Sequence, residues 1–129
     1  GIMNPEMEAP DEVRFKLPNV KAKEIHFMIT ASFPGRRGSN VGEIVIEYED
    51  GTRDALDLVY GRNVFAFNDP GVGPGSRPVW HGSSANGQEI ALHDLTWENR
   101  NPEKSIRYII LRSAGTETSP ILLAITGVN

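Results

Sequence analysis

The residues that most often carry enzymatic chemistry are sparse in this sequence or badly spaced for it. The three histidines, His26, His81 and His93, lie far apart and form no HExxH or other short ligand motif. We interpret each as a surface or hydrogen-bonded side chain, with His26 and His93 on strand faces opposite the nearest apolar positions. Cysteine is absent, which removes disulfides, thiolate metal ligands and cysteine nucleophiles together.

Paired carboxylates are a second route to catalysis, because two of them across a groove can hydrolyse a glycosidic bond. Glu43, Glu47 and Asp57 would project from one sheet face if their segments are strands. A small domain offers no deep cleft for this reaction, so we interpret the acids as a solvated face. The alternating glycines at 71, 73 and 75 lack the following helix of a phosphate cradle. The chain is therefore predicted not to be an enzyme.

The aromatic residues point to binding instead. Glycans present apolar C–H faces and many hydroxyls, so their sites combine an exposed aromatic ring with planar polar side chains. Trp97 and Tyr60 are favoured as core residues at the ends of strands, whereas Trp80 is a candidate platform. The predicted ligand-binding residues are Trp80, Phe67, Arg62, Asn63, Arg36 and Asn99.

These side chains must be positioned by strands, because short apolar runs are separated by 13 glycines and 9 prolines. No run carries a helical stripe over 11 or more residues. The sequence predicts an all-β, antiparallel two-sheet β-sandwich of the jelly-roll kind, with about eight strands. The predicted strands are Val13–Leu17, Glu24–Ala31, Val41–Glu49, Thr52–Tyr60, Pro78–His81, Gln88–Trp97, Ser105–Ser113 and Pro120–Val128.

The strongest local signal is Asp50-Gly51 between two alternating runs, which predicts a hairpin with a type I′ turn. Alternation then places three apolar side chains of each strand on one face. The six predicted core residues of this hairpin are Ile44, Ile46, Tyr48, Leu56, Leu58 and Tyr60.

Three long connections are expected at one end of the sandwich if successive strands simply alternate in direction. They are Ser32–Asn40, Gly61–Arg77 and Glu98–Lys104. Long loops on a rigid β scaffold are where binding residues concentrate. We therefore expect the binding surface on this loop end, above all on Gly61–Arg77. No cofactor is predicted, although a structural calcium ion held by loop oxygens is left open.

Size and charge limit the remaining possibilities. The 129 residues suit one domain, predicted over residues 13–129, with residues 1–12 as a lead-in or linker remnant. A net charge of −4 offers no basic footprint for nucleic acid. No apolar run approaches the roughly 20 residues of a membrane span. We expect neither nucleic acid nor a membrane as a partner.

Several ordered segments together resemble a known type of module. From about Val20 to Thr126 the chain is similar to galactose-binding-domain-like jelly-roll modules, which are appended to bacterial glycoside hydrolases. It departs from their pattern at Phe65-Ala66-Phe67, where a Trp is usual. It also departs after Trp97-Glu98-Asn99, where a Pro usually follows and this chain has Arg100. The segments that carry the resemblance are Ile25–Met28, Gly42–Ile44, Glu47–Thr52, Val59–Val64, Val79–Gly82, Thr96–Asn99 and Pro120–Thr126.

The resemblance implies a secreted, extracellular carbohydrate-binding module. Its partners would be a polysaccharide or oligosaccharide and a covalently linked catalytic domain, which the module would target to its glycan substrate. The alternative is a structural domain of a multidomain secreted enzyme that packs on its neighbour and has no ligand of its own. A continuous apolar patch around Phe65, Phe67 and Trp80, without polar partners, would favour this alternative.

Overall fold

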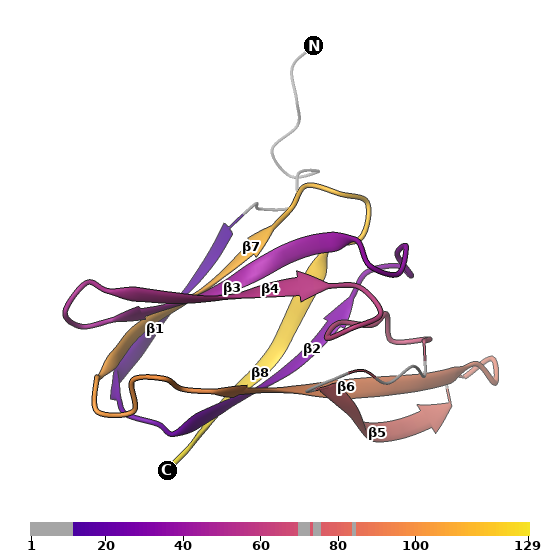
Figure 1. Ribbon diagram of the computed structural model, residues 1–129. Coiled ribbons are helices and arrows are strands. Elements are labelled where there is room, and N and C mark those ends of the chain that lie inside the picture. The colour runs from indigo at the N-terminus through magenta and orange to yellow at the C-terminus, as the bar shows by residue number, and fades with distance from the viewer. Residues whose placement is uncertain (1–11, 70–72, 74–75, 84) are drawn as a thin grey trace.

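The computed structural model describes residues 12–69, 73, 76–83 and 85–129, without the side chains of His81 and Glu89. Within these ranges the chain is all β, with eight strands and no helix (Figure 1). The strands are β1 (Glu12–Val20), β2 (Glu24–Ala31), β3 (Asn40–Tyr48), β4 (Arg53–Val59), β5 (Ser76–Ser83), β6 (Glu89–Glu98), β7 (Ile106–Ser113) and β8 (Pro120–Val128).

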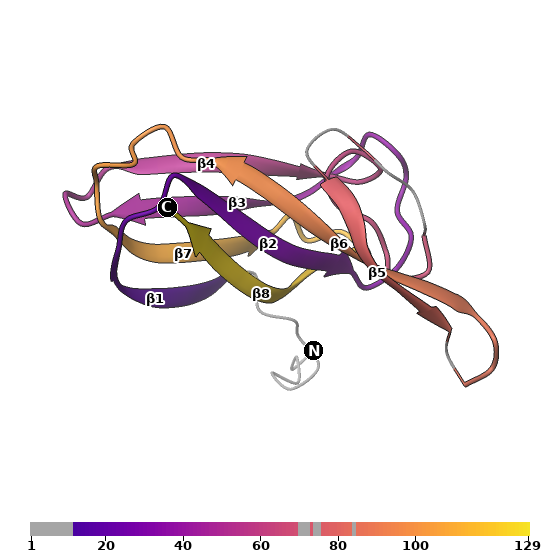
Figure 2. The ribbon, with the colours of Figure 1, turned by 90° about the horizontal axis from the view of Figure 1, so that it is seen from below.

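The strands form two four-stranded antiparallel sheets, which confirms the predicted β-sandwich. Sheet A has the order β1-β7-β3-β4 and sheet B the order β5-β6-β2-β8. The pair β2–β6 lies inside the pair β1–β7 along the sequence, whereas β3–β4 and β5–β6 are hairpins. Figure 2 shows the sandwich from below. There β1, an edge strand of sheet A, lies near β8, an edge strand of sheet B. No helix in the described part of the chain is long and apolar enough to cross a membrane.

The core lies between the sheets, where alternate residues of each strand meet. Five of the six predicted core residues of the β3–β4 hairpin are fully buried, and Leu56 is partly buried against them. Trp97 is also in the core, as favoured from the sequence. The lead-in predicted over residues 1–12 lies outside the described residues except for Glu12, which already belongs to β1 opposite Arg112.

The hairpin itself is confirmed, but its turn type is not. Gly51 has φ of +86°, whereas Asp50 does not have a positive φ, as a type I′ turn would require. The Tyr48 N–H donates to the Thr52 carbonyl at 2.9 Å, and the Gly51 N–H donates to the Tyr48 carbonyl at 2.9 Å. This is a three-residue loop, in which only the glycine needs the left-handed conformation. The Asp50 carboxylate stabilises it by accepting from the Thr52 N–H at 2.9 Å.

The prediction that three long connections share one end is wrong for Glu98–Lys104. Simple alternation fails because β4 and β5 run in the same direction (Figure 1). Every later connection therefore changes ends. Lys104 Nζ lies 3.0 Å from Thr52 Oγ1 in the β3–β4 turn, at the end opposite to Ser32–Asn40.

Candidate functional site

Two of the predicted binding residues are structural. Asn63 is only 6% exposed, and its side chain holds the turn after β4. It accepts from the Val59 N–H at 2.8 Å and donates to the Asp57 carbonyl at 2.8 Å. These bonds occupy both ends of the amide, because backbone groups at a buried turn need partners. The Asn63 amide is therefore not presented to a ligand.

Asn99 has a similar role at the other end of the molecule. It is 8% exposed, accepts from the Tyr48 hydroxyl at 2.7 Å, and donates to the Ala22 carbonyl at 2.7 Å. It also accepts from the Asn101 N–H at 2.9 Å. The structure thus separates Asn99 from the other predicted site residues, since Arg36, Arg62 and Asn63 lie at the opposite end.

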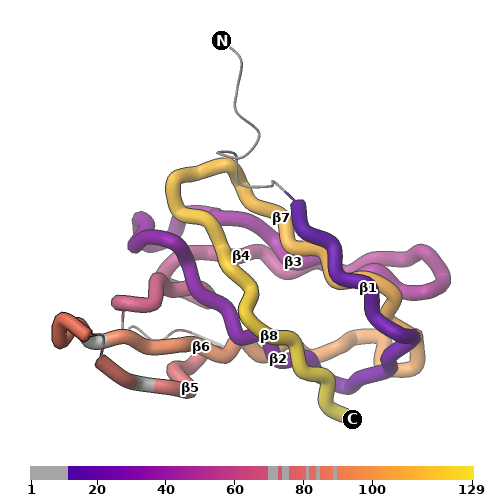
Figure 3. The backbone as a smooth tube through the Cα atoms, turned by 180° about the vertical axis from the view of Figure 1, so that it is seen from behind, coloured from indigo at the N-terminus to yellow at the C-terminus, as the bar shows by residue number. Residues whose placement is uncertain are grey.

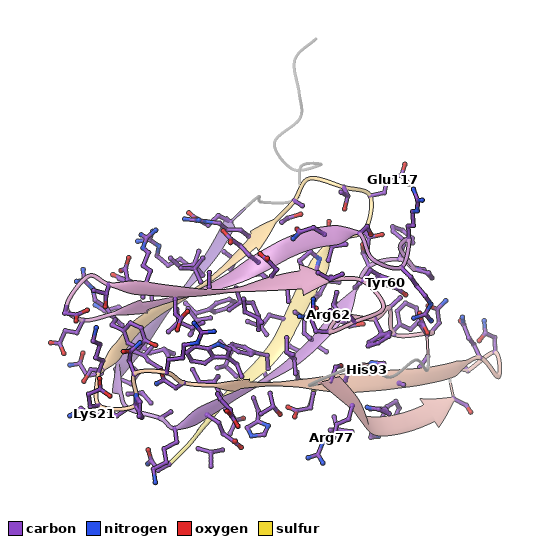
Figure 4. The ribbon with its side chains drawn as sticks, in the orientation of Figure 1. Lys21, Tyr60, Arg62, Arg77, His93 and Glu117 are labelled. Carbon is purple, nitrogen blue, oxygen red and sulfur yellow. The ribbon has the colours of Figure 1, made fainter. Side chains whose placement is uncertain are left out.

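Arg36, Arg62 and Phe67 are exposed and belong to the loops at the predicted loop end. Figure 4 labels Arg62 and its neighbour Tyr60. The two loops that carry them are joined by backbone hydrogen bonds, such as the Gly38 N–H to the Tyr60 carbonyl at 2.9 Å. The Tyr60 hydroxyl donates to Asp69 at 2.8 Å. Next to Arg36 in the chain, Arg37 Nη2 lies 3.5 Å from Asp69 Oδ1, so this end carries a polar cluster of its own.

Trp80 lies elsewhere, on the outer face of sheet B. In the β5–β6 register, Arg77 is opposite Asp94 and Trp80 is opposite Leu92, with a bulge between Pro78 and Trp80. Directly opposite residues project from the same face of a sheet. The extra residue of the bulge therefore puts Trp80 on the face that carries Arg77, although regular alternation would separate them.

The indole of Trp80 is 47% exposed and lies over Gly82 on the same strand. A Cβ on Gly82 would meet the Trp80 ring at 2.1 Å, so only glycine allows the ring to lie against the strand backbone. Trp80 thus presents one side of its ring along the sheet surface. A ring in this orientation is suited to stacking on another flat, partly apolar group.

Beside Trp80 and Arg77, the same face carries a compact polar cluster from β2 and β6. His26 Nδ1 lies 2.9 Å from Asp94 Oδ2, and His26 Nε2 lies 2.7 Å from Glu24 Oε1. The Thr96 hydroxyl donates to Asp94 Oδ2 at 3.0 Å. The register explains the grouping, since His26 is opposite Thr96 and Glu24 is opposite Glu98. We call Glu24, His26, Arg77, Trp80, Asp94 and Thr96 the sheet B site.

A shallow depression of about 400 Å³ is lined by four of these residues, Glu24, His26, Arg77 and Thr96, together with Ser76. Arg77 points away from sheet A (Figure 4). The hydrogen bond to Asp94, followed by that to Glu24, raises the pKa of His26 above 6.5, because both favour the imidazolium. The depression therefore presents the Arg77 guanidinium, the Glu24 carboxylate, the His26 imidazole and the Thr96 hydroxyl, all of which can form hydrogen bonds.

Two of the three carboxylates considered for glycoside hydrolysis are paired with arginines on the outer face of sheet A. Glu43 Oε1 lies 3.1 Å from Arg112, and Glu47 Oε1 lies 2.8 Å from Arg53. Asp57 is directly opposite Glu43 in the β3–β4 register. Ion pairs thus cover this face, in agreement with the solvated face expected from the sequence.

The strand face predicted for His93 is wrong, because its side chain is fully buried on the inner face of sheet B. Its ring stacks on Phe65 with centroids 4.7 Å apart. His93 therefore shares a face with Leu95, which is two residues away along β6 and also buried. The His81 side chain lies outside the described residues. Within the described residues, no three acidic or histidine side chains are grouped so as to hold a metal ion.

Sequence reasoning missed five members of the sheet B site: Glu24, His26, Arg77, Asp94 and Thr96. The available signal was alternation, which puts Glu24 and His26 on one face of β2 and Asp94 and Thr96 on one face of β6. Their juxtaposition depends on which strands are neighbours, and β2 and β6 are far apart in the sequence. Comparison with known families, curated proteins and solved structures finds no match for the chain.

Proposed function

We propose that the chain is a non-catalytic carbohydrate-binding module that targets a larger secreted polysaccharide-degrading enzyme to its glycan, and that the sheet B site is its binding surface. The observation that carries the proposal is the exposed indole of Trp80, set on the same sheet face as Arg77 and the hydrogen-bonded His26 cluster. A sugar ring would stack on the indole, and its hydroxyls would bond to the charged side chains.

The shape of the surface supports an extended ligand. The sheet B site spans β5, β6 and β2, so its donors and acceptors are held by strands rather than by loops. A shallow depression suits a polymer that passes over the module better than a small ligand that must be enclosed. Binding to each site would be weak, and attachment to a catalytic domain would raise the effective concentration of that domain near its substrate.

The packing alternative receives less support. Its expected sign is a continuous apolar patch around Phe65, Phe67 and Trp80, but Phe65 is fully buried. Trp80 shares its face with Arg77 and Asp94. A domain that buried this face against a neighbour would have to desolvate these charged groups, which is costly without matched partners.

The test is affinity electrophoresis of the purified chain in gels that contain different neutral and acidic polysaccharides, followed by calorimetry with oligosaccharides of the retarding polymer. Trp80→Ala should remove the retardation, because stacking supplies much of the affinity. Val79→Ala is the matched control, since Val79 is an exposed apolar neighbour on the same strand. Retardation that survives in Trp80→Ala would contradict the proposal. So would the absence of retardation of the unmutated chain by every polysaccharide tried. Loss of binding in Phe67→Ala instead would move the site to the loop end.

A further inference from the structure

The four sheet edges of the sandwich are protected to different degrees. Edge strands are open to pairing with other strands, and proteins usually block them with charges, prolines or bulges. β4 carries Arg53, Asp54 and Asp57, and β1 carries charged residues and Pro18. β5 carries Arg77, an internal proline and a bulge.

β8 is the least protected edge, although its pairing with β2 has a register shift between Met28 and Ile29 that leaves Leu123 as an extra residue. Its sequence, Pro-Ile-Leu-Leu-Ala-Ile-Thr-Gly-Val, contains no charged residue, and its only proline is the first residue. The strand pairs with β2 on one side and, among the described residues, has no neighbouring strand on the other. Ile121, Leu123 and Val128 are exposed, Leu123 by 49%. Figure 3 shows β8 passing along the back of the molecule beside β2.

The inner side of the same edge is also apolar. An open groove of about 510 Å³ lies between β8 and β1, with Leu122, Val13 and Phe15 among its lining residues. A second, smaller cavity of about 120 Å³ follows further along β8, beside Ile125 and Leu17. The two cavities show that the sheets are not closed over the core along this side.

We propose that β8 is a self-association edge, at which a second copy of this chain pairs its own β8 in antiparallel fashion to join the two B sheets into one. A two-fold axis brings identical strands together in this way. Each strand would satisfy the free backbone groups of the other, and apolar side chains beside the groove would be buried.

Charge favours a second copy as the partner. Pairing β8 with any other edge of this sandwich would set charged residues beside Ile121 and Leu123, whereas β8 against β8 buries no charge.

The charges at the two ends of β8 also match. Exposed Glu117 precedes β8, while exposed Lys23 lies at the other end, where its N–H donates to the Val128 carbonyl at 2.8 Å. Antiparallel pairing over the whole strand brings Glu117 of each copy toward Lys23 of the other. Figure 4 shows Glu117 at one end of the molecule and Lys21, two residues before Lys23, at the other.

Sedimentation equilibrium of the full chain over a wide concentration range tests the proposal. We expect a reversible dimer. Leu123→Lys should weaken dimerisation by about tenfold or more, because whole-strand antiparallel pairing would put the two added charges diagonally across the new strand pair, among apolar side chains. Val79→Lys, which places the same charge on an equally exposed residue of β5, is the matched control and should leave dimerisation unchanged.

A charge exchange tests the antiparallel register. Glu117→Lys should weaken the dimer, and adding Lys23→Glu should restore it, because the pair is then only reversed. Hydrogen exchange at the β8 amides should slow as the unmutated chain is concentrated. This readout does not depend on whether a variant folds.

A chain that stays monomeric at every concentration overturns the proposal, even if another protein is found to bind the groove. A dimer that Leu123→Lys does not weaken, or that Val79→Lys weakens equally, also overturns it. Concentration-independent exchange at β8 in a dimer would show that another surface is the interface. Neither glycan binding nor its loss enters these outcomes.

Discussion

Trp80 and Trp97 have the same side chain but opposite surroundings. Trp97 is on the inner face of β6 and is 8% exposed, packed in the core between the two sheets. Trp80 is on the outer face of β5, where the bulge and Gly82 support it. Substitution of the two residues should therefore affect different properties, one stability and the other binding.

Trp97→Ala should destabilise the fold by about 3–5 kcal/mol, the usual cost of truncating a large aromatic residue in a core. Urea denaturation followed by circular dichroism measures this change. Trp80→Ala should leave the unfolding midpoint almost unchanged. A large loss of stability in Trp80→Ala together with a small one in Trp97→Ala would reverse the assignment of the two residues.

His26 should make stability depend on pH. Its folded-state pKa is raised by the hydrogen bonds to Asp94 and Glu24, so the folded chain holds the proton more tightly than the unfolded chain. The resulting stabilisation is fully present below about pH 6.5, where both states are protonated, and is lost as pH rises through the raised pKa. The unfolding free energy of the unmutated chain, relative to His26→Gln, should therefore fall as pH is raised from about 5.5 to 9.

Nuclear magnetic resonance of the His26 ring provides the direct check. The raised value is distinguished from that of a solvent-exposed histidine by its dependence on the carboxylates, so Asp94→Asn should lower the His26 pKa. A His26 pKa at or below 6.5 in the unmutated chain would contradict the hydrogen-bonded arrangement.

At the scale of elements, β5 controls the candidate site. The strand is an edge of sheet B, and its bulge gives Arg77 and Trp80 a common face. β6 and β2 supply the polar cluster from the interior of the sheet, where their register is set by pairing on both sides. Trp80 and Arg77 thus lie on an edge strand that is paired on one side only, whereas Glu24, His26, Asp94 and Thr96 lie on strands that are paired on both sides.

Gly82→Ala tests the role of β5. The added Cβ would overlap the Trp80 ring at 2.1 Å, so the indole must leave its place against the strand. We expect weaker glycan binding with little change in global stability, because Trp80 makes no part of the core. In a Trp97→Phe background, the fluorescence of Trp80 should shift its emission maximum. Gly127→Ala, on β8 of the same sheet, is the control, because the added Cβ would make only ordinary contact with Ala22 at 3.4 Å. An unchanged emission maximum in Gly82→Ala would show that the ring does not depend on Gly82.

At the scale of the whole molecule, the two sheets have different outer faces. Sheet A is covered by exposed ion pairs, such as Arg112 with Glu12 and Glu43. Sheet B carries Trp80 and the His26 cluster, and its β8 edge is free. Joining two B sheets through β8 would place two candidate sites on one continuous surface, from which a polymer could be bound at two points.

Dimerisation should therefore strengthen binding to long polysaccharides more than to short oligosaccharides. The second contact on the same polymer is intramolecular, and linked sites commonly gain about a hundredfold or more in apparent affinity. We expect Leu123→Lys to reduce this gain for the polymer while leaving the affinity for an oligosaccharide unchanged. Calorimetry with both ligands measures the difference. Equal losses for both ligands would place Leu123 in the glycan site itself.

Much of the fold follows from local patterns in the sequence. Alternation in Ile44, Ile46 and Tyr48 predicts a strand and its buried face, because the side-chain period of a strand is two. Gly51 predicts a hairpin, because a tight turn needs a positive φ. The exact turn was mispredicted, since the same glycine also suits a three-residue loop. These features depend only on neighbouring residues, which is why the sequence alone determines them.

The site was decided by tertiary structure. Asn63 and Asn99 are chemically suitable for binding a sugar. Their side-chain amides instead form hydrogen bonds with buried backbone groups, which the sequence does not reveal. Because β4 and β5 run in the same direction, Glu98–Lys104 lies at the far end, and the bulge turns Trp80 outward. Strand direction and neighbours arise from pairing between distant segments, so no local pattern encodes them. The sequence by itself therefore determined the strands and the aromatic residue available for binding, while the tertiary structure decided which polar groups stand beside it.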